Sequence, residues 1–226
     1  MYRRETIDRV LTMARETGKR LEAVPVDEIK IAISHGNRKI GRAMNVSLMP
    51  IFTCKNCDAC KWLCYDIKAC VQYPNTVIDA RMRNTILLRR DRDEFFSRID
   101  AAISRRRKNK FFRWHVAGDI VDADYFARMV DIARRHDDFI FWTYTKVYGI
   151  VNAWIDENGP LPENFHVMFS EWRGMPMDNP HGLPEFRVVF KDEEKPAGHY
   201  CPGNCDICKN QHRGCVAGET TYCLEH

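Results

Sequence analysis

Residues 112–146 read FRWHVAGDIVDADYFARMVDIARRHDDFIFWTYTK, and this stretch decides the fold class. Apolar and polar residues alternate over 112–116, which predicts a strand that ends at Ala117-Gly118-Asp119. Apolar residues then recur at helical spacing over 126–133, and the apolar run 139–145 predicts a second, buried strand. A strand, a helix and a strand in this order are typical of a parallel βα unit.

The same alternation of helices and strands continues on both sides of this unit. It predicts helices over 5–22, 78–90 and 91–103, and a short helix that follows Lys146 and ends at about residue 158. It also predicts strands over 29–33, 46–51, 165–170 and 186–190. Asp91 and Asp122 are candidate N-caps. We therefore predict an α/β fold in which parallel βα units form a partial, TIM-like barrel or an open sheet. Residues 1–195 would form this domain with a cysteine-rich loop at 54–70, and residues 196–223 a C-terminal metal-binding segment.

All ten cysteines fall into two windows, and this grouping indicates metal binding. The first window has the C-x2-C-x2-C-x3-C spacing of bacterial ferredoxins, and its cysteines are Cys54, Cys57, Cys60 and Cys64. Four thiolates so close in sequence can surround one compact centre, so we predict an iron–sulfur cluster, although Tyr65 stands where ferredoxins carry proline. Tetrahedral zinc is the alternative. Cys70 is interpreted as a buried thiol or a spare ligand.

The second window contains Cys201, Cys205, Cys208, Cys215 and Cys223. Its first three members have the C-x3-C-x2-C spacing of radical S-adenosylmethionine (SAM) enzymes, but in those enzymes the loop follows the first barrel strand. Adding Cys215 or Cys223 gives a closed four-cysteine site, which predicts an auxiliary iron–sulfur cluster or structural zinc. We thus expect one or two [4Fe–4S] clusters, with Zn²⁺ as the alternative, on eight ligands: Cys54, Cys57, Cys60, Cys64, Cys201, Cys205, Cys208 and Cys215.

Polar residues follow three of the predicted strands: Gly118 and Asp119, Thr145 and Lys146, and Ser170 and Glu171. Sites in parallel α/β folds form at the carboxyl ends of the strands. We expect catalytic roles for Asp119, Lys146 and Glu171, and cofactor contacts from Gly118, Asp119, Thr145 and Ser170. The structural alternatives are a turn or capping role for Asp119 and a solvated side chain for Lys146.

Composition places the chain among ordinary globular proteins with a formal net charge of +4. We find no apolar run of the length that spans a membrane and no signal peptide, so we expect a cytoplasmic protein whose thiols stay reduced. Residues 224–226 resemble the start of an expression tag.

Basic residues concentrate over 81–110. They form either a solvated helix surface or a surface that binds nucleic acid or a phosphate-bearing substrate. The glycine-flanked turn Asn37-Arg38-Lys39 could also hold an anion.

Several motifs resemble the gene product 88 family of phage and mobile-element proteins. They are Gly36 to Gly41, Cys64-Tyr65, 112–120, 124–126, 141–146 and the cysteine-rich C-terminus, which together cover about residues 30–223. The resemblance implies a phage or plasmid origin but no specific activity. The order of elements is also distantly similar to radical-SAM partial barrels, in which a Gly-Gly-Glu motif holds the SAM amino group. Gly118-Asp119 would take that place here, with one glycine fewer and a shorter acid.

Two functions follow from these patterns. The first is an iron–sulfur redox or radical-type enzyme, which would use SAM if one iron is open to a ligand and would need an electron donor. The alternative is a zinc-stabilised nucleic-acid-binding protein that uses residues 81–110.

Overall fold

The computed structural model describes residues 3–58 and 60–225, and the chain divides into two compact units. Unit 1 comprises residues 1–34, 46–105 and 115–119, and unit 2 comprises residues 35–45, 106–114 and 120–226. Each unit is therefore assembled from three separate pieces of the chain. The segment 196–223, predicted as a separate part, belongs to unit 2.

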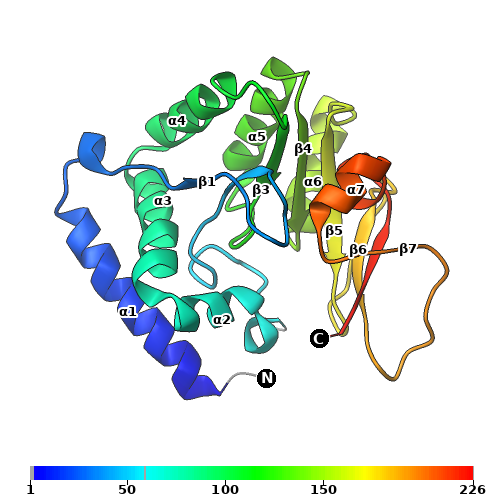
Figure 1. Cartoon of the computed structure of the whole chain (residues 1–226), viewed down its shortest axis with the longest axis horizontal. Helices are drawn as coiled ribbons and strands as arrows, with labels where there is room; N and C mark the ends of the chain where they lie inside the picture. Colours follow the sequence, from blue (N-terminus) through cyan, green and yellow to red (C-terminus); the bar gives the residue numbers. More distant parts are fainter. Residues whose placement is uncertain (1–2, 59, 226) are drawn as a thin grey trace. The chain divides into compact units, whose positions relative to one another are not determined.

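The strands form an eight-stranded sheet in the order β1-β2-β3-β4-β5-β6-β8-β7. They are β1 (Ile33–Ser34), β2 (Met44–Val46), β3 (Phe111–Trp114), β4 (Ile140–Thr145), β5 (Phe165–Glu171), β6 (Glu185–Val189), β7 (His199–Tyr200) and β8 (Thr221–Leu224) (Figure 1). From β3 to β8 every pairing is parallel, which confirms the predicted α/β class. The sheet is open over the described strands, so the partial TIM-like barrel is not confirmed.

Seven α-helices and four single-turn helices accompany these strands in the described residues. The α-helices are α1 (Arg4–Glu22), α2 (Tyr65–Gln72), α3 (Asp79–Arg90), α4 (Arg92–Ser104), α5 (Ala123–Arg135), α6 (Tyr148–Asn158) and α7 (Cys205–Gln211). The 3₁₀ turns are η1 (Val26–Glu28), η2 (Lys61–Leu63) and η4 (Gly214–Ala217), and η3 (Pro74–Ile78) is a π-helical turn. No helix in the described part of the chain is long and apolar enough to span a membrane.

The core of unit 2 is built on two consecutive βα units, as the sequence predicts. The register of β3, β4 and β5 sets Phe112 opposite Phe141 and Phe141 opposite Phe165, and all three side chains are buried. Phe126 of α5 and Trp154 of α6 pack edge to face with 5.8 Å between their ring centroids. Burying each aromatic ring contributes about 1.5–3 kcal/mol, so these crossover helices hold the sheet firmly.

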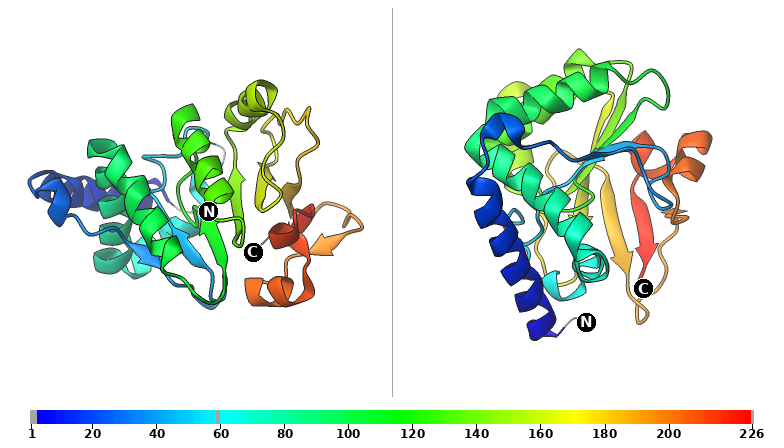
Figure 2. Two further views of the ribbon diagram at one scale, coloured as in Figure 1. Left: turned by 90° about the horizontal axis from the view of Figure 1, so that it is seen from above. Right: turned by 60° about the vertical axis from the view of Figure 1, so that its left-hand side comes forward.

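The C-terminal cysteine segment adds two strands to this sheet. β8 pairs with β6 on one side and with β7 on the other, and α7 and η4 lie between β7 and β8 in sequence (Figure 2). The Glu225 N–H donates to the Val189 carbonyl at 3.0 Å, so the pairing extends past Leu224. Of the predicted tag residues 224–226, His226 lies outside the described residues.

Unit 1 is organised around α3, which packs against α1 and α4. The fully buried Asn84 of α3 uses its side chain as a backbone partner: its Oδ1 accepts from the Ala32 N–H, and its Nδ2 donates to the Ala32 and Ser47 carbonyls at 2.9 Å each. These bonds satisfy backbone groups at Ala32 and Ser47, which lie just outside β1 and β2. The two strands are short, and they overlap the predicted strands 29–33 and 46–51 only at Ile33 and Val46.

Candidate functional site

The first cysteine loop, residues 54–64, ends where α2 begins. The Cys60 and Lys61 N–H groups both donate to the Cys57 carbonyl, at 3.1 and 2.8 Å, and the Leu63 N–H donates to the Cys60 carbonyl at 3.0 Å. These bonds mark two consecutive tight turns, one closed on the Cys57 carbonyl and the next on the Cys60 carbonyl. Cys54, Cys57, Cys60 and Cys64 are all partly exposed.

The four thiols of this loop lie close enough to influence one another's ionisation. Burial and then the charge of Asp119 raise the pKa of Cys54, with smaller contributions from Cys64 and Cys57. Burial also raises the pKa of Cys57 and of Cys64, and Cys60 contributes to both. Because each thiolate disfavours its neighbours, the set can be ionised together only beside a cation.

Backbone donors lie at one end of the loop. Cys64 is the N-cap residue of α2, and hydrogen bonding from the Ile67 and Asp66 backbone partly offsets the burial that raises its pKa. Donors of this kind stabilise a thiolate sulfur, whether or not it is bound to metal.

Cys70 has a different environment from the loop cysteines. It is fully buried, and its sulfur lies 3.9 Å from an Asp66 carboxylate oxygen. Asp66 is itself buried and accepts two hydrogen bonds from Arg81, at 3.1 and 3.3 Å. Burial and then Asp66 raise the pKa of Cys70 to about 12. This setting fits the interpretation of Cys70 as a buried thiol.

Gly118 and Asp119 lie beside the segment that leads into the first cysteine loop, within unit 1. Gly118 has φ +87°, and a Cβ atom there would lie 2.7 Å from Leu48 Cβ and 2.9 Å from Thr53 Oγ1. Asp119 is buried, and its charge reaches Cys54. The structure thus brings a candidate catalytic acid next to a candidate metal ligand.

The strand ends of unit 2 bring Lys146 and Ser170 together. The Lys146 ammonium donates to Ser170 Oγ at 2.8 Å and lies 5.7 Å from the ring centroid of Trp172. The Tyr148 hydroxyl donates to the Ser170 carbonyl at 2.6 Å. These contacts join the ends of β4 and β5, so Lys146 is held in place rather than freely solvated.

The other two candidates in unit 2 have structural contacts. Burial raises the pKa of Glu171, against the opposing charge of Arg187 at 3.5 Å. Thr145 is fully buried, and its Oγ1 accepts a hydrogen bond from the Val147 N–H at 3.1 Å. Thr145 therefore supports the backbone just before α6.

The second cysteine group gathers around α7. Cys205 and Cys208 are three residues apart on this helix and so share a face. Burial raises the pKa of each to about 11, and the charges of Cys201 and Cys215 act on both. Cys201, Cys205, Cys208 and Cys215 therefore form one electrostatic group, and His199 Nε2 lies 3.5 Å from the Cys208 sulfur.

Cys223 is less closely tied to this group. Its sulfur lies 3.5 Å from the neighbouring Leu224 carbonyl, and burial followed by Cys201 raises its pKa. Within the described residues, no three His, Cys, Asp or Glu side chains are drawn together around a point where a single metal ion would sit, in either window.

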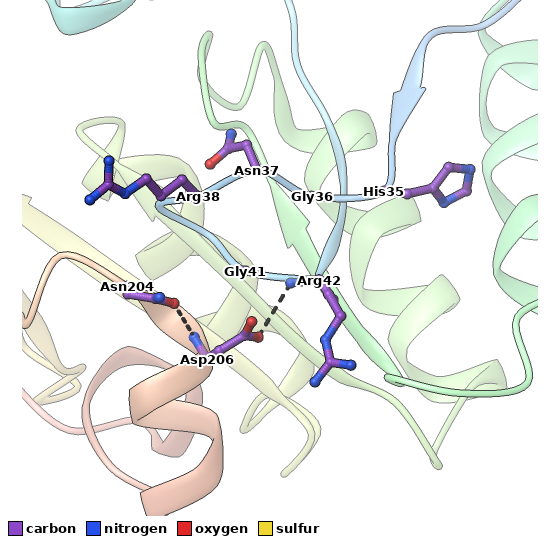
Figure 3. A pocket seen from close by; sticks show the side chains of 8 residues that line it. All are labelled: His35, Gly36, Asn37, Arg38, Gly41, Arg42, Asn204 and Asp206. Atoms are coloured by element: carbon purple, nitrogen blue, oxygen red, sulfur yellow. Dashed lines mark hydrogen bonds between the residues drawn. The ribbon is translucent and has the colours of Figure 1, made fainter.

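A cavity of about 370 Å³ opens in unit 2 at the turn Gly36 to Gly41, which carries one of the sequence motifs. Figure 3 shows the side chains that line it: His35, Gly36, Asn37, Arg38, Gly41, Arg42, Asn204 and Asp206. Asn37 shapes the turn, because its Oδ1 accepts from the Lys39 and Ile40 N–H groups at 2.8 and 3.1 Å.

This turn is bonded to the start of α7. The Cys205 N–H donates to the Lys39 carbonyl at 2.8 Å, and the Arg42 N–H donates to Asp206 Oδ1 at 3.3 Å. Asp206 also pairs with Lys209, which partly neutralises the carboxylate in the cavity. The Arg38 and Arg42 side chains leave the turn in different directions (Figure 3).

The basic stretch 81–110 divides into two parts with different roles. The α3 arginines bind groups of unit 1, namely the carboxylates of Asp66, Asp79 and Glu22 and the carbonyls of Lys30, Leu21 and Val24. Residues 106–108 belong to unit 2, and Arg106 donates to the Arg42 carbonyl at 3.2 Å. Arg107 and Lys108 are exposed, and no acidic side chain in the described chain pairs with either. The exposed charges of Arg107 and Lys108 are therefore available to a ligand.

Sequence reasoning did not identify the side chains that surround the second cysteine group. Trp142 and Tyr144 of β4 and the half-buried Arg113 of β3 lie there, and His199 precedes it. The alternation within 139–145 could have placed Trp142 and Tyr144 on one sheet face. No local signal shows that the cysteine segment covers that face, because this depends on β8 pairing with β6.

The comparisons with known proteins give one match. The family model described as Gene product 88 matches residues 15–198, so the chain belongs to that family. Comparison with curated proteins and with solved structures finds no match.

Proposed function

We propose that this gene product 88 family protein is an iron–sulfur protein whose first cluster is held by Cys54, Cys57, Cys60 and Cys64. Its function would be redox chemistry in a protein of phage or mobile-element origin. A cluster supplies one-electron transfer when bound. The described side chains fit such a group, because four partly exposed thiols share one short loop. These thiols can ionise together only beside cationic charge, which the iron of a cluster would supply.

The observation that carries this proposal is the backbone of the loop. The loop makes tight turns at Cys57 and Cys60, and the start of α2 provides backbone donors at Cys64. The C-x2-C-x2-C-x3-C spacing is typical of ferredoxin clusters, whereas structural zinc pairs are usually further apart in sequence.

Asp119 would give this centre a protein group for proton handling. It is the acid whose charge acts on Cys54, and Gly118 holds its backbone against Leu48 and Thr53. A carboxylate next to a cluster can take or release a proton as the charge of the cluster changes. We therefore propose that Asp119 acts with the first cluster.

The test compares loop and buried cysteines in anaerobically purified full-length protein. We expect absorption near 400 nm in the wild type and in Cys70→Ser, and a loss of roughly half or more of the iron in Cys60→Ser, since ligand loss removes the cluster. Cys70→Ser is the matched control, because it changes one sulfur to oxygen in the same unit. Equal iron in both variants would contradict the assignment of the loop.

A SAM-dependent radical enzyme is the narrower form of this proposal. It requires one iron that the protein leaves open to a ligand. Paramagnetic resonance spectra of the reduced protein before and after addition of SAM would test it. A change in the cluster signal supports SAM binding, and identical spectra restrict the proposal to a redox protein with closed clusters.

Nucleic-acid binding is a second candidate, and the position of residues 106–108 favours it. Arg38 and Arg42 line the cavity, and Arg106 of this segment donates a hydrogen bond to the Arg42 carbonyl. Because Arg38 and Arg42 point in different directions, an extended polyanion matches them better than one phosphate group (Figure 3).

Binding of a labelled single-stranded DNA and RNA, measured by fluorescence anisotropy across a salt series, tests this candidate. We expect the variant Arg38→Ala/Arg107→Ala/Lys108→Ala to bind more weakly and to lower the slope of log K against log salt by about 2. The control Arg4→Ala/Arg9→Ala/Arg15→Ala removes the same charge from the exposed residues of α1. Equal binding by both variants would rule out this surface.

A further inference from the structure

The second cysteine group lies over a sheet face that carries hydrogen-bond donors. Trp142 and Tyr144 are two residues apart in β4, so both side chains project from the same face. On that face they pack in one cluster with Cys205, Cys208 and Cys215. The cysteines are thus seated on specific polar groups as well as on an apolar surface.

The Trp142 indole is the most informative of these groups. Its side chain is fully buried, and no acceptor in the described part of the chain lies within hydrogen-bond reach of Nε1. An unpaired buried N–H costs about 1–3 kcal/mol, and native proteins contain few of them. A sulfur of a metal centre on the neighbouring cysteines would accept this bond.

Tyr144 and Arg113 add further compensation for negative charge. The Tyr144 hydroxyl is hydrogen-bonded to the Cys215 sulfur. The Arg113 guanidinium lies 4.6 Å from the Tyr144 ring centroid, on the same side of the sheet as the cysteines. A donor and a cation therefore meet where sulfur would carry negative charge.

We propose that Cys201, Cys205, Cys208 and Cys215 hold a second iron–sulfur cluster, and that the Trp142 N–H donates a hydrogen bond to one of its sulfurs. This inference rests on the proposed function, because it assigns iron to a group that zinc could also bind. A hydrogen bond to sulfur stabilises the reduced cluster, which carries one more negative charge, and so raises its reduction potential. Trp142 is a positioning residue in this account.

The experiment isolates the second centre in the full-length chain. The double variant Cys57→Ser/Cys60→Ser removes two ligands of the first loop and serves as the background. Trp142→Phe removes the N–H and keeps an aromatic ring. Trp154→Phe is the matched control, because Trp154 is also a buried tryptophan of unit 2 but packs on Phe126. Iron and sulfide per chain are measured, and paramagnetic resonance gives the midpoint potential.

We expect the background variant to keep iron and sulfide, and Trp142→Phe to shift the midpoint potential to more negative values while Trp154→Phe leaves it unchanged. If Trp142→Phe loses the cluster, Tyr144→Phe provides the second measurement. We expect it to shift the midpoint potential to more negative values, because it removes the hydroxyl that donates a hydrogen bond to Cys215. The inference is overturned if the variant that keeps the cluster, Trp142→Phe or Tyr144→Phe, has an unchanged midpoint potential. It is also overturned if Trp154→Phe shifts the potential by the same amount.

The failures of the two proposals are distinguishable. Iron and sulfide in the wild type but none in the background variant would overturn this inference and leave the first cluster in place. Zinc without sulfide in the background variant would also overturn the second cluster and leave the first cluster in place. A wild type that lacks both iron and sulfide would overturn the proposed function and this inference together.

Discussion

At the scale of single residues, Gly118 shows how a missing side chain positions the candidate site. Its φ of +87° belongs to the left-handed region, and Leu48 and Thr53 occupy the space that a Cβ would need. Both neighbours precede Cys54, so the close approach sets where the first cysteine loop begins. Asp119 follows directly and is placed by the same contact.

Gly118→Ala is expected to be more destabilising than an alanine at a glycine without neighbours. Gly174 is the matched control, because its φ is +79° and a Cβ there would meet nothing within 4 Å. Left-handed strain costs about 1–2 kcal/mol at either position, and overpacking at Gly118 adds about 1–3 kcal/mol. Urea unfolding of both variants measures the difference, and equal losses would show that Leu48 and Thr53 move away at little cost.

Single residues were predictable where spacing alone defines the chemistry. The cysteine groupings and the proximity of the Gly118-Asp119 strand end to the first loop follow from the sequence pattern and the fold class. The role of Thr145 as an acceptor for the Val147 N–H and the burial of Trp142 beside cysteines do not, because both depend on which elements pack above the strand.

At the scale of elements, α2 links the first cysteine loop to the rest of unit 1. Asp66 and Cys70 face inward from this short helix, and Arg81 of α3 binds the Asp66 carboxylate. The Asp66 side chain is only 3% exposed, so Arg81 is the group that compensates its charge. This ion pair ties α2 to α3.

Arg81→Met is expected to destabilise the protein by about 3–5 kcal/mol, because it leaves a buried carboxylate without its partner. The control is Arg83→Met, whose partner Asp79 is 37% exposed at its side chain. An exposed pair is worth about 0–1 kcal/mol. Chemical denaturation gives both values, and similar small losses would mean that water reaches Asp66.

The long elements were predictable and the short ones were not. Helical periodicity and the caps Asp91 and Asp122 gave α4 and α5, and both caps bind the N–H groups expected, at 2.9 and 2.8 Å. In contrast, α2, α7, β7 and β8 are short and lie among cysteines, where apolar periodicity is interrupted. Local patterns carry little information about such elements, because tertiary pairing stabilises them.

At the scale of the whole molecule, the chain builds two units from interleaved pieces. Residues 35–45 and 106–114 join unit 2, although the segments around them belong to unit 1. A boundary at 195 follows composition, whereas the observed units follow packing across distant segments. Each unit contains one of the two cysteine windows, so each proposed cluster has its own protein environment.

Family membership and fold together leave the metal as the central question. The proposed iron–sulfur clusters would account for the two cysteine windows, for the charge of Asp119 near Cys54 and for the unpaired Trp142 donor. Zinc would also account for the cysteine windows. Inorganic sulfide distinguishes the two, since zinc sites of four cysteines contain none.

The most direct measurement is therefore the content of iron and acid-labile sulfide per chain in anaerobically purified protein. We predict iron and sulfide in about equal amounts, up to about eight of each if both windows hold a [4Fe–4S] cluster. Stoichiometric zinc without sulfide would contradict the account.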